Sequence, residues 1–244
     1  MEASSDTRRG LVALGDSITR GQGGTPALGV HFQSWAQWLA EALALPFTNL
    51  AADGARTPDV LAGQLPRVRG PYDLATLYVG VNDARGLDWD AAAFARDVET
   101  ILAALDAAAD RVLVLTIPHD LGRPAAAPKP AEAGRILRAA AERHGAVVAD
   151  LDGFGGRRTV LPDVVHPTSL GMLAIADVAA RALGAAVVPS TLAEPVGGPW
   201  HEARYAAWWR RLWLREQRRR VRERLATRAT VATSSRSAGR SRHE

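Results

Sequence analysis

Short runs of apolar residues alternate along the chain with longer stretches in which apolar residues recur every three or four positions. A continuous apolar run between glycine, proline or polar residues is typical of a buried strand, and the longer spacing is typical of an amphipathic helix. The runs predict strands over residues 11–15, 47–51, 73–80, 111–117 and 146–151. The spaced stretches predict helices over residues 32–45, 90–109, 131–144 and 169–184, the last with Ser169 as its candidate N-cap.

This alternation of strands and helices predicts the fold class. Parallel strands joined by right-handed helical crossovers give such an order, and continuously apolar strands are covered on both faces. We therefore expect a three-layer α/β domain with five strands, within residues 1–190. A change in charge and aromatic content near residues 195–199 predicts a boundary. A basic aromatic helical extension over residues 191–227 and a disordered tail over residues 228–244 are expected to follow.

Polar residues stand directly after several of the predicted strands. Asp16 and Ser17 follow the first strand, Gly54 follows the second and Asn82 follows the third, while His166 lies beyond the fifth. In a sheet of this type ligands bind at the carboxyl ends of the strands. We therefore expect these residues to converge on one edge of the sheet.

The convergent residues could together carry out acyl transfer. A serine hydroxyl such as Ser17 is a weak nucleophile until a base takes its proton, and His166 is the best candidate base. Asp163 lies three residues before it, where its carboxylate can hold one imidazole nitrogen and leave the other for the serine. The backbone N–H groups of Ser17 and Gly54 and the side-chain amide of Asn82 are candidate donors to an oxyanion.

Each of these features alone also has a purely structural interpretation. A Gly-Asp-Ser sequence is most often a turn, an Asn-Asp pair after a strand is often a helix cap, and a single histidine is more often structural than catalytic. The joint position of these residues at strand ends, in this order, favours the catalytic interpretation.

Four blocks of the chain resemble the GDSL, or SGNH, hydrolase family of esterases and lipases. The blocks are GDSITRG (15–21), NLAADGART (49–57), GVND (80–83) and DVVHP (163–167). The resemblance covers about 180 residues, and residues beyond about 190 fall outside it. It identifies Ser17 as the nucleophile, Gly54 and Asn82 as oxyanion residues, Asp163 as the supporting acid and His166 as the base.

The resemblance implies a flavodoxin-like SGNH hydrolase fold and a reaction that needs no cofactor. It implies cleavage of carboxylic esters, esterase- or lipase-like, through an acyl-serine intermediate with water as the usual second nucleophile. Two alternatives stay open. The same site could serve an acyltransferase or a carbohydrate deacetylase, or the chain could be a non-catalytic binding protein that acts through its basic aromatic tail.

Loops around the predicted site would determine which ester is accepted. Residues 21–31 form a glycine-rich loop beside Ser17 that we expect to be open to water, which favours small or flexible acyl esters. Arg85, Trp89 and His119 are the candidate residues of the substrate pocket.

Charge is distributed unevenly along a chain whose formal net charge is +4. Residues 200–244 hold thirteen arginines and four glutamates, a formal charge of +9, which leaves −5 on residues 1–199. At helical spacing, residues 199–227 place one aromatic face among arginines, formed by Tyr205, Trp208, Trp209, Leu212 and Trp213.

Two main interpretations of this helix compete. The aromatic face could dock on the acidic catalytic domain, which the opposite charges favour. Alternatively, the helix could lie on an anionic membrane or polymer surface. A nucleic acid or protein partner is a third option, although no motif predicts a specific nucleic acid.

The remaining composition excludes several classes of site. The chain has no cysteine, which excludes disulfides, thiolate metal sites and a cysteine nucleophile. No His/Asp/Glu spacing typical of a metal site is present. No apolar stretch reaches the length of a membrane span, and the N-terminal apolar run is too short for a signal peptide. We therefore expect a cytoplasmic enzyme without a metal or cofactor, acting on a small-molecule ester.

Overall fold

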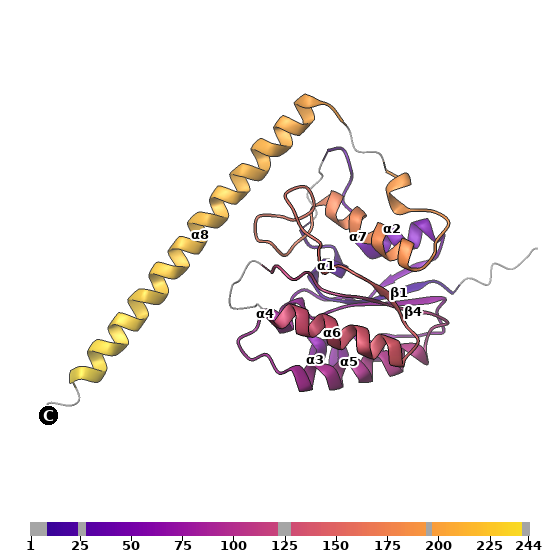
Figure 1. Ribbon diagram of the computed structural model, residues 1–244, viewed down its shortest axis with the longest axis horizontal. Helices are drawn as coiled ribbons and strands as arrows, with labels where there is room; N and C mark the ends of the chain where they lie inside the picture. Colours follow the sequence, from indigo (N-terminus) through magenta and orange to yellow (C-terminus); the bar gives the residue numbers. More distant parts are fainter. Residues whose placement is uncertain (1–8, 24–27, 122–127, 194–196, 241–244) are drawn as a thin grey trace, which may run out of the picture.

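Five strands form one parallel sheet at the centre of the molecule, in the order β2-β1-β3-β4-β5 (Figure 1). The computed structural model describes residues 9–23, 28–121, 128–193 and 197–240. The strands are β1 (Leu11–Gly15), β2 (Phe47–Asn49), β3 (Leu74–Tyr78), β4 (Val112–Leu115) and β5 (Val147–Ala149). Each strand lies inside the apolar run that predicts it, so the predicted five-stranded α/β fold is confirmed.

Four longer helices cover the two faces of the sheet. The first and last of them pack together on one face, and the middle two pack together on the other (Figure 1). They are α2 (Trp35–Ala42), α5 (Ala91–Asp106), α6 (Lys129–Arg143) and α7 (Ser169–Ala182). The buried stripe of α5 consists of the residues that the helical spacing predicts, namely Phe94, Val98, Ile101, Leu102 and Leu105. Burying each such side chain contributes about 1.5–3 kcal/mol.

Shorter helical elements connect these units. They are α1 (Ser17–Arg20), α3 (Thr57–Asp59), the π-helical turn η1 (Val60–Gln64), the 3₁₀ turns η2 (Leu65–Arg67) and η4 (Pro189–Thr191), and α4 (Val81–Arg85). The sequence pattern did not predict them, because one or two turns are too short to establish a hydrophobic period.

Side-chain caps define where three of the longer helices begin. Ser34 caps α2 and Asp90 caps α5 with oxygens that accept hydrogen bonds from backbone N–H groups. At α7 the cap is Thr168 and not the predicted Ser169, since the Thr168 hydroxyl accepts from the N–H of Gly171 at 3.1 Å. Ser169 is already the first helical residue, whereas a cap stands one residue before it in extended backbone.

The strand order creates a crevice at the carboxyl ends of β1 and β3. After β1 the chain passes through α2 on one face to reach β2, whereas after β3 it passes through α5 on the opposite face to reach β4 (Figure 1). Neighbouring strands whose connections leave on opposite faces form a topological switch point, where ligands bind in sheets of this type. The residues that follow β1 and β3 therefore lie together at this crevice.

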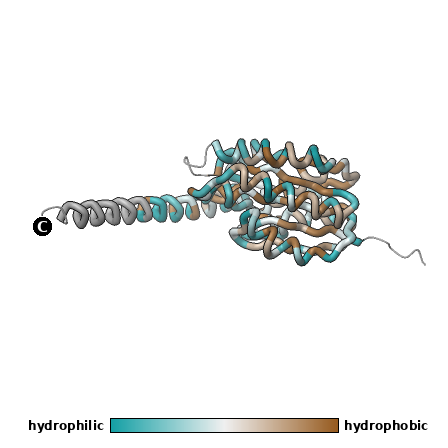
Figure 2. The backbone as a smooth tube through the Cα atoms, turned by 90° about the horizontal axis from the view of Figure 1, so that it is seen from below, coloured by the Kyte–Doolittle hydropathy of each residue, from teal (hydrophilic) through white to brown (hydrophobic). Residues whose placement is uncertain are grey.

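A long helix, α8 (Pro199–Arg240), follows the α/β domain and extends past its edge (Figure 1). The coloured residues of α8 are mostly hydrophilic, in contrast to the hydrophobic residues of the strands (Figure 2). The helix continues beyond residue 227, where we expected it to end and disorder to begin. No proline interrupts residues 200–240, and alanine and arginine, which are frequent there, are strong helix formers. Residues 194–196 at the predicted boundary and 241–244 of the predicted tail lie outside the described residues.

Candidate active site

Ser17 is the first residue of α1 and comes directly after β1 and Asp16. The carboxylate of Asp16 caps this short helix by accepting a hydrogen bond from the N–H of Ile18 at 2.9 Å. Burial raises the pKa of Asp16 to about 7, against the lowering effects of the Ile18 bond and of nearby His166. Ser17 itself is only 6% exposed. It is thus held at the carboxyl edge of the sheet by a buried acid.

Gly15 ends β1 in a position that only glycine can occupy. Its φ of +154° is rarely adopted by other residues, and a Cβ atom there would stand 2.3 Å from the carbonyl oxygen of Tyr78 on β3. The side-chain amide of Gln64 accepts a hydrogen bond from the N–H of Gly15 at 2.9 Å and donates one to its C=O at 2.8 Å. Sequence reasoning missed Gln64, because a single glutamine outside any periodic segment carries no signal of such a contact.

Ser17, His166 and Asp163 form one hydrogen-bonded chain. The distance from Ser17 Oγ to His166 Nε2 is 3.1 Å, and the distance from His166 Nδ1 to Asp163 Oδ2 is 2.6 Å. Because a carboxylate only accepts, Nδ1 carries the proton, and Nε2 is the atom that can accept from the serine hydroxyl. The structure therefore brings these three predicted residues together.

The turn that carries Asp163 and His166 is stabilised by the Asp163 carboxylate. Its Oδ1 accepts hydrogen bonds from the N–H groups of Val165 and His166, each at 3.0 Å. Burial alone would raise the pKa of Asp163, but the bonds from the His166 ring and from these N–H groups outweigh it and lower the pKa. Val164 has a φ of +63°, which costs a β-branched residue on the order of 1–3 kcal/mol. The turn is therefore strained and depends on these hydrogen bonds.

The two residues predicted as oxyanion donors besides Ser17 lie close to one another. Gly54 is in a turn after β2 with a φ of +72°, and nothing occupies the 4 Å around the position of a Cβ atom there. Asn82, in the first turn of α4, donates a side-chain N–H to the carbonyl of Ala55 at 3.1 Å. This bond ties α4 to the turn that contains Gly54.

The buried carboxylate of Asp83 stabilises the segment that follows this turn, at the start of α3. It accepts hydrogen bonds from the N–H and from the hydroxyl of Thr57, each at 3.1 Å. Burial raises the pKa of Asp83 despite these two bonds. Sequence reasoning placed Asp83 beside Asn82 but did not predict this supporting contact.

A cavity of about 680 Å³ opens over these residues. Ser17, Gly54, Asn82, Asp163 and His166 all contribute to its wall. Its other described lining residues are Gln22, Arg56, Arg85, Gly86, Leu87, Val165 and Arg219. A hydroxyl group with a base in reach and several N–H donors around one space is an arrangement suited to acyl transfer.

The family model described as the GDSL-like lipase/acylhydrolase family matches residues 13–174. The chain belongs to this family. The resemblance carried by the four sequence blocks is thereby confirmed, and the protein, a GDSL hydrolase, is an enzyme that acts on carboxylic esters.

Solved structures similar to this GDSL hydrolase have the same α/β fold. LAE5, an α/β hydrolase from the metagenome of Lake Arreo in Spain, is 22% identical with a TM-score of 0.61, over 73% of this chain and 96% of that chain. Axe2, an acetylxylan esterase from Geobacillus stearothermophilus, is 16% identical with a TM-score of 0.56, over 72% of this chain and 95% of that chain. A comparison with curated protein sequences finds no match.

Of the three predicted substrate-pocket residues of the GDSL hydrolase, Arg85 lines the cavity, whereas Trp89 and His119 are not among its described lining residues. The indole N–H of Trp89 donates to the Glu132 carboxylate at 2.9 Å, so Trp89 links the start of α5 to α6. His119 lies 3.1 Å from the carboxylate of Asp152, beyond the end of β4. Both rings therefore have polar partners of their own, and their part in the substrate pocket stays a prediction. Arg56 and Arg219 line the cavity but were not singled out from the sequence.

The glycine-rich loop expected beside Ser17 does border the site, since Gln22 lines the cavity. Residues 24–27 of this loop lie outside the described residues. The same holds for residues 122–127 of the proline-rich loop after His119.

Helix α8 docks on the loop that leads to the Asp163–His166 turn. The hydroxyl of Tyr205 donates to the backbone carbonyl of Arg157 at 2.7 Å. The indole N–H of Trp209 donates to the carbonyl of Val160 at 3.2 Å. About three turns further along α8, the Arg220 guanidinium lies 3.5 Å from the carbonyl oxygen of Pro162. Of the two main interpretations of this helix, the contacts correspond to docking on the catalytic domain.

Part of the aromatic face, and Trp200 near the start of α8, nevertheless remain in contact with solvent. Trp200 is 69% exposed and Trp213 is 41% exposed, with Leu214 exposed beside it. A groove of about 1000 Å³ runs between α8 and Arg157 and Arg158, away from Ser17.

Two further kinds of site are absent from the described residues. They contain no cluster of three or more His, Asp or Glu side chains that could hold a metal ion. In the same part of the chain, no helix combines the length and the apolar character that a membrane span requires.

Proposed function

We propose that this enzyme cleaves esters through an acyl-serine intermediate on Ser17, with His166 as the general base and Asp163 as the residue that orients it. One observation carries the proposal: the Ser17–His166–Asp163 chain opens into the cavity that Gly54 and Asn82 also line. The 3.1 Å distance between Ser17 Oγ and His166 Nε2 is within the range for direct proton transfer. Membership in a family of acylhydrolases supports the same reaction.

In the first half of the reaction, the Ser17 oxygen attacks the ester carbonyl carbon while its proton moves to Nε2 of His166. Asp163, ionised because its pKa is lowered, stabilises the imidazolium that forms. The tetrahedral intermediate then breaks its bond to the leaving alkoxide, which takes the proton from His166 and departs as an alcohol. In the second half, water gives a proton to His166 and attacks the acyl-serine. The proton returns to Ser17 and the carboxylic acid is released.

Three N–H groups would stabilise the negative oxygen of the intermediate. The N–H of Ser17 belongs to the first residue of α1, where a helix offers no internal acceptor. The N–H of Gly54 lies in the open turn after β2. An amide carries two N–H groups, so the bond from Asn82 to Ala55 leaves a second donor for the oxyanion. Losing one such donor typically costs on the order of 100- to 1000-fold in kcat.

The shape of the site favours a small acyl group. A second cavity of about 60 Å³ has Ile18, Val81 and Val165 in its wall, which are the sequence neighbours of Ser17, Asn82 and His166. One water needs roughly 10–15 Å³ on such a scale, so this apolar recess has room for a short acyl chain but not for a long one.

The first test is hydrolysis of p-nitrophenyl esters, from acetate to palmitate, by the wild type and by Ser17→Ala. We expect the wild type to cleave acetate and butyrate and to lose activity beyond about eight carbons. We expect Ser17→Ala to lose at least about 1000-fold, because the nucleophile is absent. A fluorophosphonate probe should label Ser17, as judged by mass spectrometry of the peptide. Residual activity above that level in a folded Ser17→Ala variant would contradict the acyl-serine mechanism.

A second candidate function keeps the chemistry and changes the substrate to an acetylated carbohydrate, or the acceptor to a sugar hydroxyl. Axe2, an acetylxylan esterase with a similar fold, favours testing this alternative. Release of acetate from acetylated xylan at a rate above that from p-nitrophenyl acetate would favour deacetylation. Formation of a sugar ester from vinyl acetate would favour acyl transfer.

The exposed part of the aromatic face motivates a separate hypothesis for α8. Trp200 and Trp213 stand among arginines, which favours contact with an anionic surface. Sedimentation with phosphatidylglycerol vesicles tests it. Equal binding by a chain that lacks residues 199–244 would eliminate this role.

A further inference from the structure

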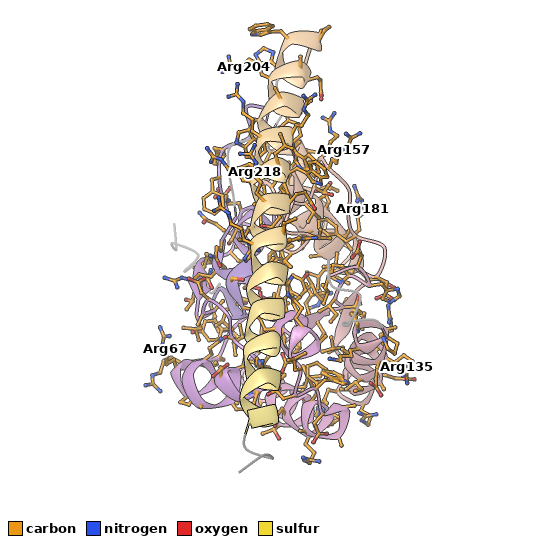
Figure 3. All side chains as sticks on the ribbon, turned by 90° about the vertical axis from the view of Figure 1, so that its left-hand side faces the viewer. Arg67, Arg135, Arg157, Arg181, Arg204 and Arg218 are labelled. Carbon is orange, nitrogen blue, oxygen red and sulfur yellow. The ribbon has the colours of Figure 1, made fainter. Side chains whose placement is uncertain are left out.

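Helix α8 contributes a side chain to the catalytic cavity. Arg219 lines the same space as Ser17 and His166, although it lies well beyond residue 174, where the family match ends. Figure 3 shows α8 crossing in front of the α/β domain, with neighbouring Arg218 labelled on the same helix. The substrate cavity is therefore built by the family domain and by a helix outside the matched segment.

Three guanidinium groups meet at this cavity from three different elements. Arg56 precedes α3, Arg85 ends α4 and Arg219 comes from α8. Among the described lining residues the only carboxylate is Asp163, which is engaged by His166. This concentration of positive charge is not a general property of the domain, since residues 1–199 carry a formal charge of −5.

Acidic partners outside the cavity hold two of these arginines. Both Asp88 oxygens bond to Nη1 of Arg56, at 2.8 and 3.0 Å, and Nη2 of Arg56 and Oδ1 of Asp88 both lie close to Gly86 at the cavity wall. Glu216 receives bonds from Nε and Nη2 of Arg219, at 2.9 and 2.8 Å. Neither Asp88 nor Glu216 is among the described residues that line the cavity. The two guanidinium groups are thus positioned in advance, so less conformational entropy is lost when they bind a ligand.

The third arginine is also positioned. Nη1 of Arg85 donates to the backbone carbonyl of Leu121 at 3.1 Å. Glu216 bonds to Arg220 as well as to Arg219, so its single negative charge is shared between two guanidinium groups. A set of fixed guanidinium groups beside a reacting centre is a binding site for a carboxylate or a phosphate, which they can hold with paired hydrogen bonds.

We propose that the physiological ester carries an anionic group, a carboxylate or a phosphate, which binds between Arg56, Arg85 and Arg219 while Ser17 attacks the ester carbonyl. This inference rests on the proposed function and specifies its substrate class. It makes α8 part of the substrate site and not only a brace for the catalytic loop. Arg219 is 60% exposed, so water screens its charge, and we expect its removal to weaken recognition about five- to tenfold.

Matched esters test the proposal. One set compares 4-acetoxybenzoate and 4-acetoxyphenyl phosphate with neutral methyl 4-acetoxybenzoate, and so places the anion on the alcohol part. The other compares mono-4-nitrophenyl succinate with 4-nitrophenyl butyrate, and so places it on the acyl part. We expect the wild type to favour an anionic member of at least one set by tenfold or more in kcat/KM. The best member identifies the anion and its position.

The variants are Arg219→Gln, Arg219→Lys and Arg218→Gln. We expect Arg219→Gln to lower the anionic-to-neutral ratio of kcat/KM five- to tenfold, and Arg219→Lys to restore part of it. Arg218→Gln removes the same charge from an exposed residue that is not among the described lining residues, so its ratio should stay within twofold of wild type. Thermal unfolding of each variant checks that the fold is retained.

Three results would overturn the inference. The wild type could show no anionic preference, Arg219→Gln could lower both rates equally, or Arg218→Gln could act as strongly as Arg219→Gln. Failure of the proposed function itself would give a different set of results. In that case no neutral ester is cleaved, or a folded Ser17→Ala variant still cleaves it.

Discussion

The two sides of the catalytic cavity are held in different ways. Ser17, Gly54 and Asn82 follow strands β1, β2 and β3, and they are positioned by the sheet and its buried polar contacts. Asp163 and His166 belong to a loop after β5, in a strained turn held mainly by its own hydrogen bonds. We call these the sheet side and the loop side of the site.

The residues of the two sides are therefore held in place by two separate sets of stabilising contacts. On the sheet side, moving Ser17 requires breaking contacts at a central strand. On the loop side, the anchors include one isolated pairing of Val160 with Pro167, a bond from the Thr168 hydroxyl to the carbonyl of Arg158, and the bonds from Tyr205 and Trp209 of α8. The sheet side should therefore fail together with the whole fold, and the loop side should fail without it.

Gln64→Ala would break the sheet side and should have the largest effect. It leaves the buried N–H of Gly15 without its side-chain partner, at about 1–3 kcal/mol. It also removes one of two bonds to the Gly15 C=O, at about 0.5–1.5 kcal/mol, because the N–H of Ala52 still donates to that oxygen at 3.2 Å. We expect the free energy of unfolding in urea to fall by about 1.5–4.5 kcal/mol, with loss of esterase activity at the same denaturant concentration. Gln37→Ala on the exposed side of α2 is the control and should change little. A loss below 1 kcal/mol for Gln64→Ala would mean that the sheet alone positions Gly15.

Asp16→Asn sharpens the comparison through pH. The folded carboxyl group keeps its proton up to a pKa of about 7, whereas the unfolded one releases it near 3.8. Between these values the folded state binds more protons, so Asp16 makes the wild type less stable as pH rises, by at most about 1.4 kcal/mol per pH unit. Asparagine keeps an oxygen for the N–H of Ile18 and cannot ionise.

The predicted signature is the difference in unfolding free energy between Asp16→Asn and the wild type. It should grow in favour of the variant from pH 5 to pH 7 and level off above pH 7. The exposed Asp106→Asn serves as the control and should run parallel to the wild type. A difference that stays constant across this range would show that Asp16 ionises normally in the folded protein.

Trp209→Phe loosens only the loop side and should have the smallest effect. It removes the N–H that donates to the carbonyl of Val160 but keeps an aromatic ring. We expect kcat/KM for p-nitrophenyl acetate to fall about threefold while the melting temperature changes by less than about 2 °C, since one such bond contributes only about 0.5–1.5 kcal/mol. Amide hydrogen exchange of residues 157–166 should become faster.

Trp200→Phe on the same helix is the matched control, because Trp200 is 69% exposed. It should leave both activity and exchange unchanged. If Trp209→Phe lowered the melting temperature by 5 °C or more, the loop side would be shown to contribute to the stability of the whole fold. The two sides would then not be independent.

The sequence predicts most of the sheet side and little of what supports it. The five strands can be predicted from the sequence because they are continuously apolar. Ser17, Gly54 and Asn82 can be predicted as site residues because each follows such a strand. The role of Gln64 cannot be predicted from the sequence. It bonds to the backbone of a residue 49 positions away, and it lies in a turn that has no hydrophobic period. The cap of α7 was predicted one residue late, because Thr168 and Ser169 are both good caps by residue type.

On the loop side, the Asp163–His166 pair is readable because the two residues are only three apart and meet on one turn. The docking of α8 was one of two interpretations that charge and aromatic spacing left open. Arg219 was not predicted, because arginines are so frequent in this helix that the sequence does not distinguish the one that lines the cavity. Trp89 and His119 were assigned to the pocket from their place in the chain. They contact Glu132 and Asp152, and their part in substrate binding stays a prediction.

The anchors of α8 have a consequence for how mutations in this region can accumulate. Tyr205 and Trp209 donate to backbone carbonyls of Arg157 and Val160, and not to their side chains. A backbone carbonyl is present whatever residue stands there, so the side chains of the loop can change while these two attachments persist. Substituting Tyr205 or Trp209, by contrast, can remove the side-chain donor and with it the attachment. Random mutagenesis should therefore recover far more neutral substitutions at the exposed Arg157 than at Tyr205, which binds its carbonyl.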